Sequence, residues 1–122
     1  MLDWQRVKAR ANGDDEFRIH ARFWDSVVKL GVGDASYRMT VASGQITEIE
    51  PWFATVACNL AIQAPEDDWN ALLESTPKPF YQDLYPATVH HGFDVVGDAQ
   101  HYCAYFPAIR RLIEIMREVK NA

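Results

Sequence analysis

Two side chains in this 122-residue sequence are candidates for general acid or base catalysis. Asp25 follows Trp24 and interrupts strand-forming sequence, and a dry pocket there would raise its proton affinity, as a general acid or base requires. The alternative is a turn residue with a solvated carboxylate. His91 is the second candidate because imidazole titrates near neutral pH, the alternative being a histidine in a solvated loop. Asp25 and His91 are therefore the candidate catalytic residues.

The spacing of histidines and cysteines does not suit a metal or a redox centre. His90 and His91 are adjacent, so on a strand they would point to opposite faces and could not readily bind one ion. Cys58 and Cys103 stand in no metal or redox spacing. The sequence also has neither a phosphate-binding loop nor a dinucleotide-binding glycine motif. We expect no metal and no cofactor.

Aromatic side chains are the richer source of binding chemistry. Rings bury large areas, and a Tyr or Trp keeps a polar tip that can orient a ligand. For each ring the alternative is ordinary core packing. From Phe80 to Phe106 the rings lie in a proline-flanked link and in a helix that contains Pro107, where regular packing is hardest, so we expect a cavity wall there. The expected ligand-binding residues are Trp24, Phe53, Phe80, Tyr81, Tyr105, Phe106 and Ile109.

Composition is that of one globular domain spanning residues 1–122, with 48% hydrophobic and 24% charged residues. The formal net charge of -5 and the scattered basic residues argue against nucleic-acid binding. No stretch approaches the roughly 20 apolar residues of a membrane span, and the N-terminus lacks the apolar run of a signal peptide. We therefore expect a cytoplasmic, reduced protein without stable membrane insertion.

The elements that must position these residues follow from periodicity. The first dozen residues suit a helix, which the turn residues 12–15 end. Apolar and polar residues alternate over 17–23, which predicts a strand, with a helix starting after Asp15 as the competing interpretation. Strands are predicted over 26–32, over 54–62, and in a hairpin of 37–41 and 45–49 around Gly44.

The second half changes to helical periodicity. A short amphipathic helix is predicted over 65–75, beginning with Pro65 and three acidic residues. One or two helical turns are predicted within 80–85, ending before Pro86. A strand over 93–96 then precedes a long helix that Asp98 caps and that should kink or break near Pro107. The pattern predicts an α+β fold with mainly antiparallel strands.

Three stretches, in this order, resemble the sterol carrier protein type 2-like family: YRMTVASGQITEIE, LAIQAPEDDWNALL and FDVVGDAQHYCAYFPAIRRLIEIM. The resemblance covers about residues 17–120 and leaves 1–14 as an N-terminal helix or extension. It implies a five-stranded, mainly antiparallel curved sheet covered on one face by helices. It also implies a tunnel for apolar small molecules between the sheet and the helices. Residues 17–34 and 79–86 are richer in aromatics than that family's lipid carriers need.

Three functions follow as hypotheses. The first is binding of an apolar or aromatic small molecule, such as a lipid, sterol or terpene, in a cavity between sheet and helices. The second is a small cofactor-free isomerase, lyase, cyclase or hydrolase that uses Asp25 or a histidine in the same cavity. The third is an accessory domain whose apolar face docks on a partner. A homodimer is compatible with each.

Overall fold

The computed structural model describes residues 2–52 and 57–122. The predicted α+β class is confirmed: the chain forms a five-stranded sheet, and helices precede its first strand, separate its last two strands and follow its last strand. Along the chain the elements are α1 (Trp4–Asn12), α2 (Asp15–Ala21), β1 (Ser26–Val32), β2 (Ala35–Ala42), β3 (Gln45–Pro51), β4 (Leu60–Ala64), α3 (Glu66–Leu72), α4 (Leu84–His90), β5 (Asp94–Gly97) and α5 (Ala99–Lys120).

The sheet has the strand order β3-β2-β1-β4-β5 and is mostly antiparallel, as predicted. Only β1 and β4, among the described pairs, run parallel. The predicted hairpin is confirmed, and its two-residue turn has positive φ angles at Ser43 and Gly44, which suits a twisted antiparallel pair. A Cβ at Gly44 would lie 2.5 Å from the Ala21 carbonyl oxygen, so this turn packs directly on the end of α2.

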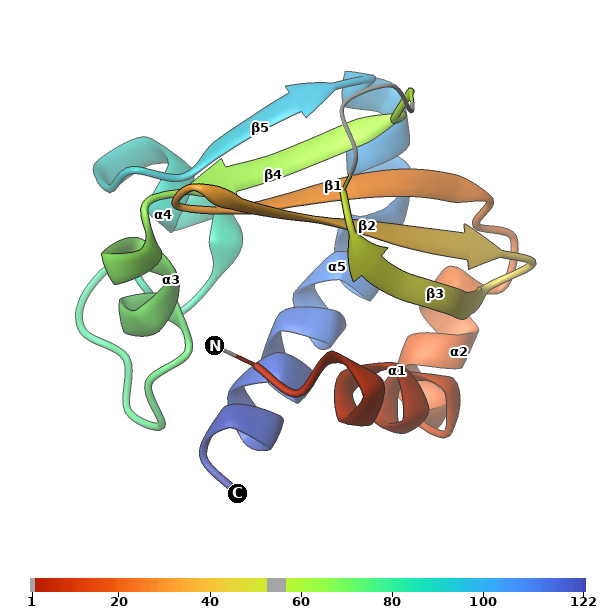
Figure 1. Ribbon diagram of the computed structural model, residues 1–122, viewed down its shortest axis with the longest axis horizontal. Coiled ribbons are helices and arrows are strands. Elements are labelled where there is room, and N and C mark those ends of the chain that lie inside the picture. The colour runs from red at the N-terminus through yellow and green to blue at the C-terminus, as the bar shows by residue number, and fades with distance from the viewer. Residues whose placement is uncertain (1, 53–56) are drawn as a thin grey trace.

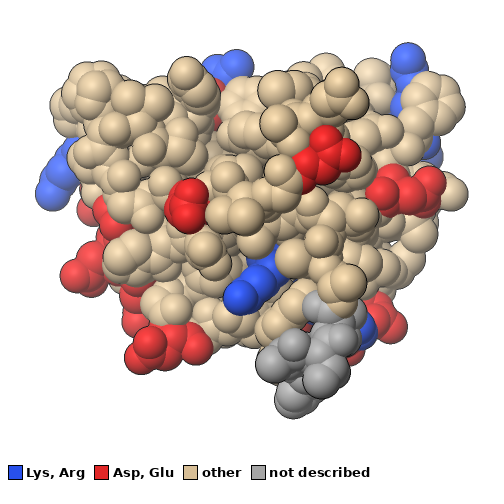
Figure 2. All heavy atoms as spheres, turned by 90° about the horizontal axis from the view of Figure 1, so that it is seen from above, with Lys and Arg blue, Asp and Glu red and all other residues tan. Residues whose placement is uncertain are grey.

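Helices α1, α2 and α5 cover one face of the sheet, and α3 and α4 lie at one end of it (Figure 1). Strand residues that point toward the helices are buried, because the pleat sends alternate side chains to one face. The core between the two layers includes Trp24, Val28, Met39, Leu60, Leu72, Ile109, Leu112 and Met116. On the opposite face, residues other than Lys, Arg, Asp and Glu make up most of the surface, with charged side chains scattered among them (Figure 2).

The predicted strand over 17–23 is wrong, and the competing helix interpretation is right. Asp14 caps this helix by accepting a hydrogen bond from the Phe17 backbone N–H at 2.8 Å. Phe17 and Ala21, four residues apart, are buried, whereas Ile19 is 59% and Phe23 is 74% exposed. The buried pair follows the helical period of 3.6 residues, and the two exposed apolar residues produced the misleading alternation.

The bounds of several other helices and strands also differ from those predicted. Helix α3 and strand β5 match the predictions over 65–75 and 93–96 to within a few residues. Of the strand predicted over 54–62, only 60–62 is observed as β4, and residues 54–56 lie outside the described residues. The helical turns predicted within 80–85 are wrong: α4 begins at Leu84, after Asp83 caps it, and contains Pro86 in its first turn, where a backbone N–H has no helical partner anyway.

Helix α5 starts as predicted but is continuous from Ala99 to Lys120, so of the predicted kink or break near Pro107 the break is wrong and the kink stays a prediction. Asp98 accepts hydrogen bonds from the backbone N–H groups of Gln100 and His101, which confirms it as the cap. Gly97 before it has a φ of +132°, and a Cβ there would meet the Asn59 carbonyl oxygen at 2.4 Å. The strand-to-helix step therefore requires glycine.

Candidate ligand-binding site

Two of the expected ligand-binding rings hold the start of α5 against β1. Trp24 is fully buried, and its Nε1–H donates to Nε2 of His101 at 2.8 Å. The Tyr105 ring stacks on Trp24 at a centroid distance of 5.4 Å, and its hydroxyl donates to the Phe23 carbonyl oxygen at 2.9 Å. Ile109, one turn further, is buried in the core. These contacts fix the orientation of α5, and none of the three residues lines a surface pocket described below.

Phe80 and Tyr81 lie elsewhere, in a stacked cluster with the two adjacent histidines. Phe80 stacks on His90 at 3.8 Å, and Tyr81 stacks on His91 at 3.7 Å between ring centroids. The Tyr81 hydroxyl donates to Asp68 at 2.6 Å, and that hydrogen bond together with burial raises the tyrosine pKa to about 12. The expected placement of the two histidines on a strand is wrong, because His90 ends α4 and His91 follows it.

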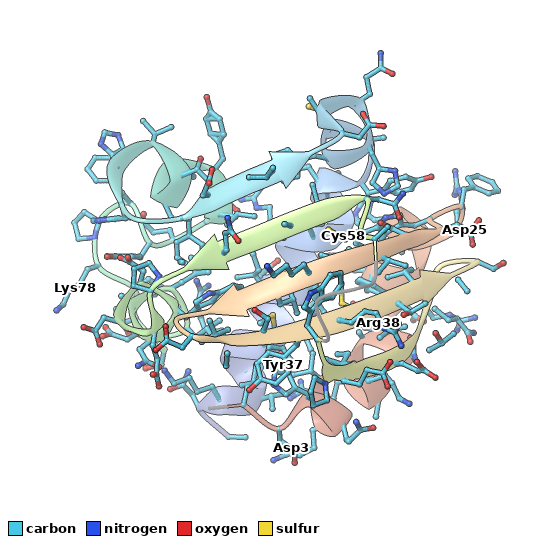
Figure 3. The ribbon with its side chains drawn as sticks, turned by 45° about the horizontal axis from the view of Figure 1, so that its top comes forward. Asp3, Asp25, Tyr37, Arg38, Cys58 and Lys78 are labelled. Carbon is cyan, nitrogen blue, oxygen red and sulfur yellow. The ribbon has the colours of Figure 1, made fainter. Side chains whose placement is uncertain are left out.

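The two candidate catalytic residues are not brought together. Asp25 is exposed and accepts a hydrogen bond from the Ser43 backbone N–H at 2.8 Å, which ties the start of β1 to the hairpin turn. Nε2 of His91 lies 3.1 Å from the Pro79 carbonyl oxygen. Asp25 and Lys78, which directly precedes Pro79, lie at opposite ends of the molecule (Figure 3). Phe53, the remaining expected residue, lies outside the described residues.

Phe106 does line a pocket, between α4 and α5. This α5 pocket has a volume of about 270 Å³, and its walls are almost wholly apolar. Its lining comprises Tyr85, Tyr102, Cys103 and Phe106. Tyr102 and Phe106 are four residues apart on α5, so they share a helix face, and their rings meet edge to face at 5.4 Å.

A second pocket adjoins the first where α4 and α5 meet the last strand. This β5 pocket has a volume of about 280 Å³ and shares Tyr85 and Tyr102 with the α5 pocket. Its other lining residues are Leu60, Thr88, Phe93, Asp94, Val95, Gly97, Asp98 and Ala99. Leu60 and Phe93 are buried and form its apolar floor, whereas Tyr85 is 59% exposed at its edge. We refer to the two pockets together as the Tyr102 site.

The Tyr102 hydroxyl is the notable polar atom of this site. It is buried and has no hydrogen-bond partner among the described residues. Burial raises the pKa of Tyr102 to about 12, and the Asp83 carboxylate, Cys103 and Tyr85 act in the same direction. The hydroxyl therefore stays protonated near neutral pH.

A larger surface hollow lies elsewhere, beside α2 and the hairpin turn. Its volume is about 470 Å³, and its lining comprises Asp15, Arg18, Ile19, Arg22, Ser43, Gly44 and Gln45. Three of its lining side chains are charged, whereas the α5 pocket has almost wholly apolar walls, which is the lining that small-molecule sites usually have. The Tyr102 site, which includes the α5 pocket, is therefore the better candidate.

The residues that form the Tyr102 site were only partly foreseen. Tyr85, Tyr102 and Phe106 belong to the rings from Phe80 to Phe106 among which the sequence predicts a cavity wall, but of the three only Phe106 is among the expected ligand-binding residues, and Cys103 is not a candidate. The spacing of Tyr102 and Phe106 at i and i+4 was the available signal, because it places both rings on one face of α5. Among the described residues, no group of three acidic, histidine or cysteine side chains could hold a metal ion, and no helix has the length and apolar character to cross a bilayer.

This chain is similar to known proteins in structure, whereas comparison of its sequence finds no match. The sequence matches no protein-family model and no curated protein. A crystal structure of sterol carrier protein 2 matches with a TM-score of 0.78 and 18% identity, covering 98% of this chain and 97% of that chain. A conserved hypothetical protein of Thermus thermophilus, described as possibly a sterol carrier protein, matches with a TM-score of 0.72 and 18% identity over 94% and 84% of the two chains.

A third structure is the palmitated form of sterol carrier protein 2 like 2 from Aedes aegypti, with a TM-score of 0.58 and 15% identity over 95% of each chain. At these identities the similarity establishes the fold. The chain has the sterol carrier protein 2 fold, as the sequence resemblance implied.

Proposed function

We propose that this protein binds an apolar small molecule, such as a lipid or a similar metabolite, in the Tyr102 site. The observation that carries the proposal is the pair of adjoining pockets, one almost wholly apolar, that share the half-buried Tyr102 and the exposed Tyr85. Small-molecule sites typically combine an apolar lining with a few polar groups that orient the ligand.

The energetics support binding of useful strength. Each ring of the site that a ligand removes from water contributes on the order of 1 kcal/mol or more. Contacts with Tyr85, Tyr102 and Phe106, together with the floor of the β5 pocket, are enough for binding in roughly the micromolar range. The shared fold adds support, because one neighbour is described as palmitated.

Chemical blocking of the site tests the proposal. Cys58 and Cys103 are both exposed, but only Cys103 lines the α5 pocket. We would prepare Cys58→Ser and Cys103→Ser, so that each variant keeps one thiol, and modify that thiol with N-phenylmaleimide. Binding of the neutral dye Nile red is then followed by fluorescence. Modification of Cys103 should abolish dye binding, because the phenyl group occupies the pocket.

The matched control is the modified Cys58 in the Cys103→Ser variant, which should bind Nile red with unchanged affinity. Equal dye binding by both modified proteins would place the dye outside the α5 pocket and contradict the proposal. Absence of dye binding by the unmodified protein would also contradict it.

A further inference from the structure

We propose that residues 82–89, which contain most of α4, form a flap over the Tyr102 site, and that its opening joins the two pockets so that one elongated apolar ligand occupies both. This inference rests on the proposed function and adds how the site admits its ligand. It is carried by the way these residues are attached to the rest of the fold, firmly at the base and weakly at the tip.

The size of the two pockets is the reason to expect a movement. The α5 pocket has a volume of about 270 Å³ and the β5 pocket about 280 Å³. Sites for small molecules generally have about 300–1,000 Å³, so each pocket alone falls just below that range and the two combined lie within it. Tyr85 of α4 and Tyr102 of α5 line both pockets, so they stand at the boundary between them. A shift of one of these helices would open that boundary.

Helix α5 is the fixed one of the two walls. In its first turn, His101 accepts a hydrogen bond from the buried indole of Trp24 at 2.8 Å. In the middle of the helix, Arg111 donates two hydrogen bonds to Asp14, at 2.9 and 3.0 Å. Its inner face also forms part of the hydrophobic core. A movement of α5 would therefore disrupt contacts throughout the fold.

Helix α4 is attached much more loosely. Among the described residues, the hydrogen bonds of residues 82–91 all remain within the segment 79–91. One ion pair, between Asp83 and Arg110 at 3.1 Å, ties the start of α4 to α5, and the described part of the chain shows no second ion pair to residues 82–91. The Arg110 side chain is 63% exposed, so this tie holds the tip of the flap only weakly.

The base of the flap is firm. Two stacked ring pairs bring the ends of residues 82–89 together, Phe80 with His90 at 3.8 Å and Tyr81 with His91 at 3.7 Å. The Tyr81 hydroxyl donates to Asp68 at 2.6 Å, which anchors this base to α3. Phe80 has a φ of +68°, and bulky residues in such strained conformations are found at switch regions. The geometry is that of a hinged segment whose tip can leave α5 while its base stays in place.

Opening has a cost that keeps the flap closed most of the time. Leu84 and Ala87 are fully buried on the inner face of α4, and their exposure to water is unfavourable. A ligand that fills the joined pockets would cover the same apolar surface. It would therefore shift the equilibrium towards the opened arrangement.

Stopped-flow mixing with the neutral dye Nile red tests whether opening limits entry. Association is followed by dye fluorescence at increasing dye concentrations for the unaltered protein, Arg110→Gln and Arg10→Gln. Arg110→Gln removes the tie at the tip, and this residue lines neither pocket of the site. The matched control, Arg10→Gln, removes another exposed ion pair of α5, between Arg10 and Glu118 at 2.6 Å, which involves no residue of the flap.

For the unaltered protein, the observed association rate should rise with dye concentration and then level off at the rate of opening. Arg110→Gln should raise this plateau by about threefold, as the loss of an exposed ion pair allows, whereas Arg10→Gln should leave it unchanged. A rate that keeps rising linearly and is equal in all three proteins would mean that the dye enters without opening, which overturns the inference.

Amide hydrogen exchange gives a second readout that needs no ligand. The amides of α4 should exchange at least about tenfold faster than those of α5 between Ala108 and Ile115, because α4 opens locally while α5 does not. Arg110→Gln should speed the exchange of α4 by about threefold and leave that of α5 unchanged. Equal protection of the two helices would overturn the inference.

Failure of this inference and failure of the proposed function are distinguishable. If Nile red binds but its association rate never levels off, the flap is overturned whatever the exchange rates, and the proposed site stands. If the unaltered protein binds no Nile red, the proposed function fails, and this inference fails with it even where α4 exchanges rapidly.

Discussion

At the scale of single residues, ordinary packing does not account for the Tyr102 hydroxyl. A phenylalanine would fill the same volume against Phe106 and Tyr85 without burying an unsatisfied donor. Buried polar groups in folded proteins are usually paired, so each exception calls for an explanation. Trp4, Ser26 and Arg38 carry the other such atoms among the described residues. In this protein Tyr102 lines two pockets, while its hydroxyl itself is buried.

The first prediction concerns stability without ligand. Tyr102→Phe should raise the free energy of unfolding by about 1 kcal/mol, because it removes a buried hydroxyl that has no partner in the described part of the chain. Urea unfolding followed by circular dichroism measures the change. Tyr105→Phe is the matched substitution, and it should lower the free energy of unfolding by about 1 kcal/mol because it removes the hydrogen bond to Phe23. Equal destabilisation by both substitutions would mean that Tyr102 has a partner in the fold.

At the scale of elements, some structure was predictable from local sequence and some was not. The hairpin of β2 and β3 was predicted because alternation and a glycine-containing turn agree. Helix α2 was mistaken for a strand because Ile19 and Phe23 are apolar yet exposed, so the sequence pattern did not follow burial. For α4 the cap Asp83 and the early Pro86 are helix-start signals, but the aromatic run before them obscured where the helix begins.

The site was harder to predict than the elements for a physical reason. Tyr85 and Tyr102 belong to different helices, and a pocket between them exists only because α4 and α5 meet beside β5. Sequence periodicity identifies the face of each helix but not which faces meet. Tyr105 illustrates the difference, since it lies three residues from Tyr102 and stacks on Trp24 instead.

The second prediction concerns the proline within α5. Pro107 is exposed and lies inside a 22-residue helix, where it cannot donate to the Cys103 carbonyl oxygen. Pro107→Ala should therefore raise the free energy of unfolding by about 1–3 kcal/mol. Thermal unfolding would detect this as a higher midpoint temperature. An unchanged midpoint would mean that the helix gains something from the proline that compensates for the lost hydrogen bond.

The third prediction concerns the ion pair that joins α2 to α5. Asp14 accepts two hydrogen bonds from the Arg111 guanidinium, at 2.9 and 3.0 Å, and these lower its pKa from 3.8 to about 2. Because the folded state favours the ionised carboxylate, the stabilisation is present above about pH 4 and is lost as the pH falls towards about 2. We expect it to amount to roughly 1–2 kcal/mol.

Urea titrations between about pH 2 and 6 test this prediction with Asp14→Asn. The substitution should lower stability at the upper end of this range and should flatten its decline at the lower end. Asp15→Asn is the control in the same helical turn, because no ion pair of Asp15 is found among the described residues. If both variants kept the pH dependence of the unaltered protein, the Asp14 interaction would not be its source.

At the scale of the whole molecule, the proposed ligand site lies at the edge of the layered fold. Side chains such as Trp24, Met39 and Ile109 fill the space between the sheet and α5. The Tyr102 site instead lies where the edge strand β5 meets α4 and the start of α5, at the top of the ribbon view (Figure 1). We therefore place the proposed apolar site at the border of the sterol carrier protein 2 fold.

The most direct test is to locate a bound ligand by nuclear magnetic resonance. Methyl 2-naphthoate is titrated into ¹⁵N-labelled protein, and backbone amide shifts are followed. The account predicts saturable shifts centred on Tyr85, Thr88, Val95 and residues 102–106, which border the two pockets. Shifts centred on Arg18, Arg22 and the hairpin turn, or no saturable shifts at all, would contradict it.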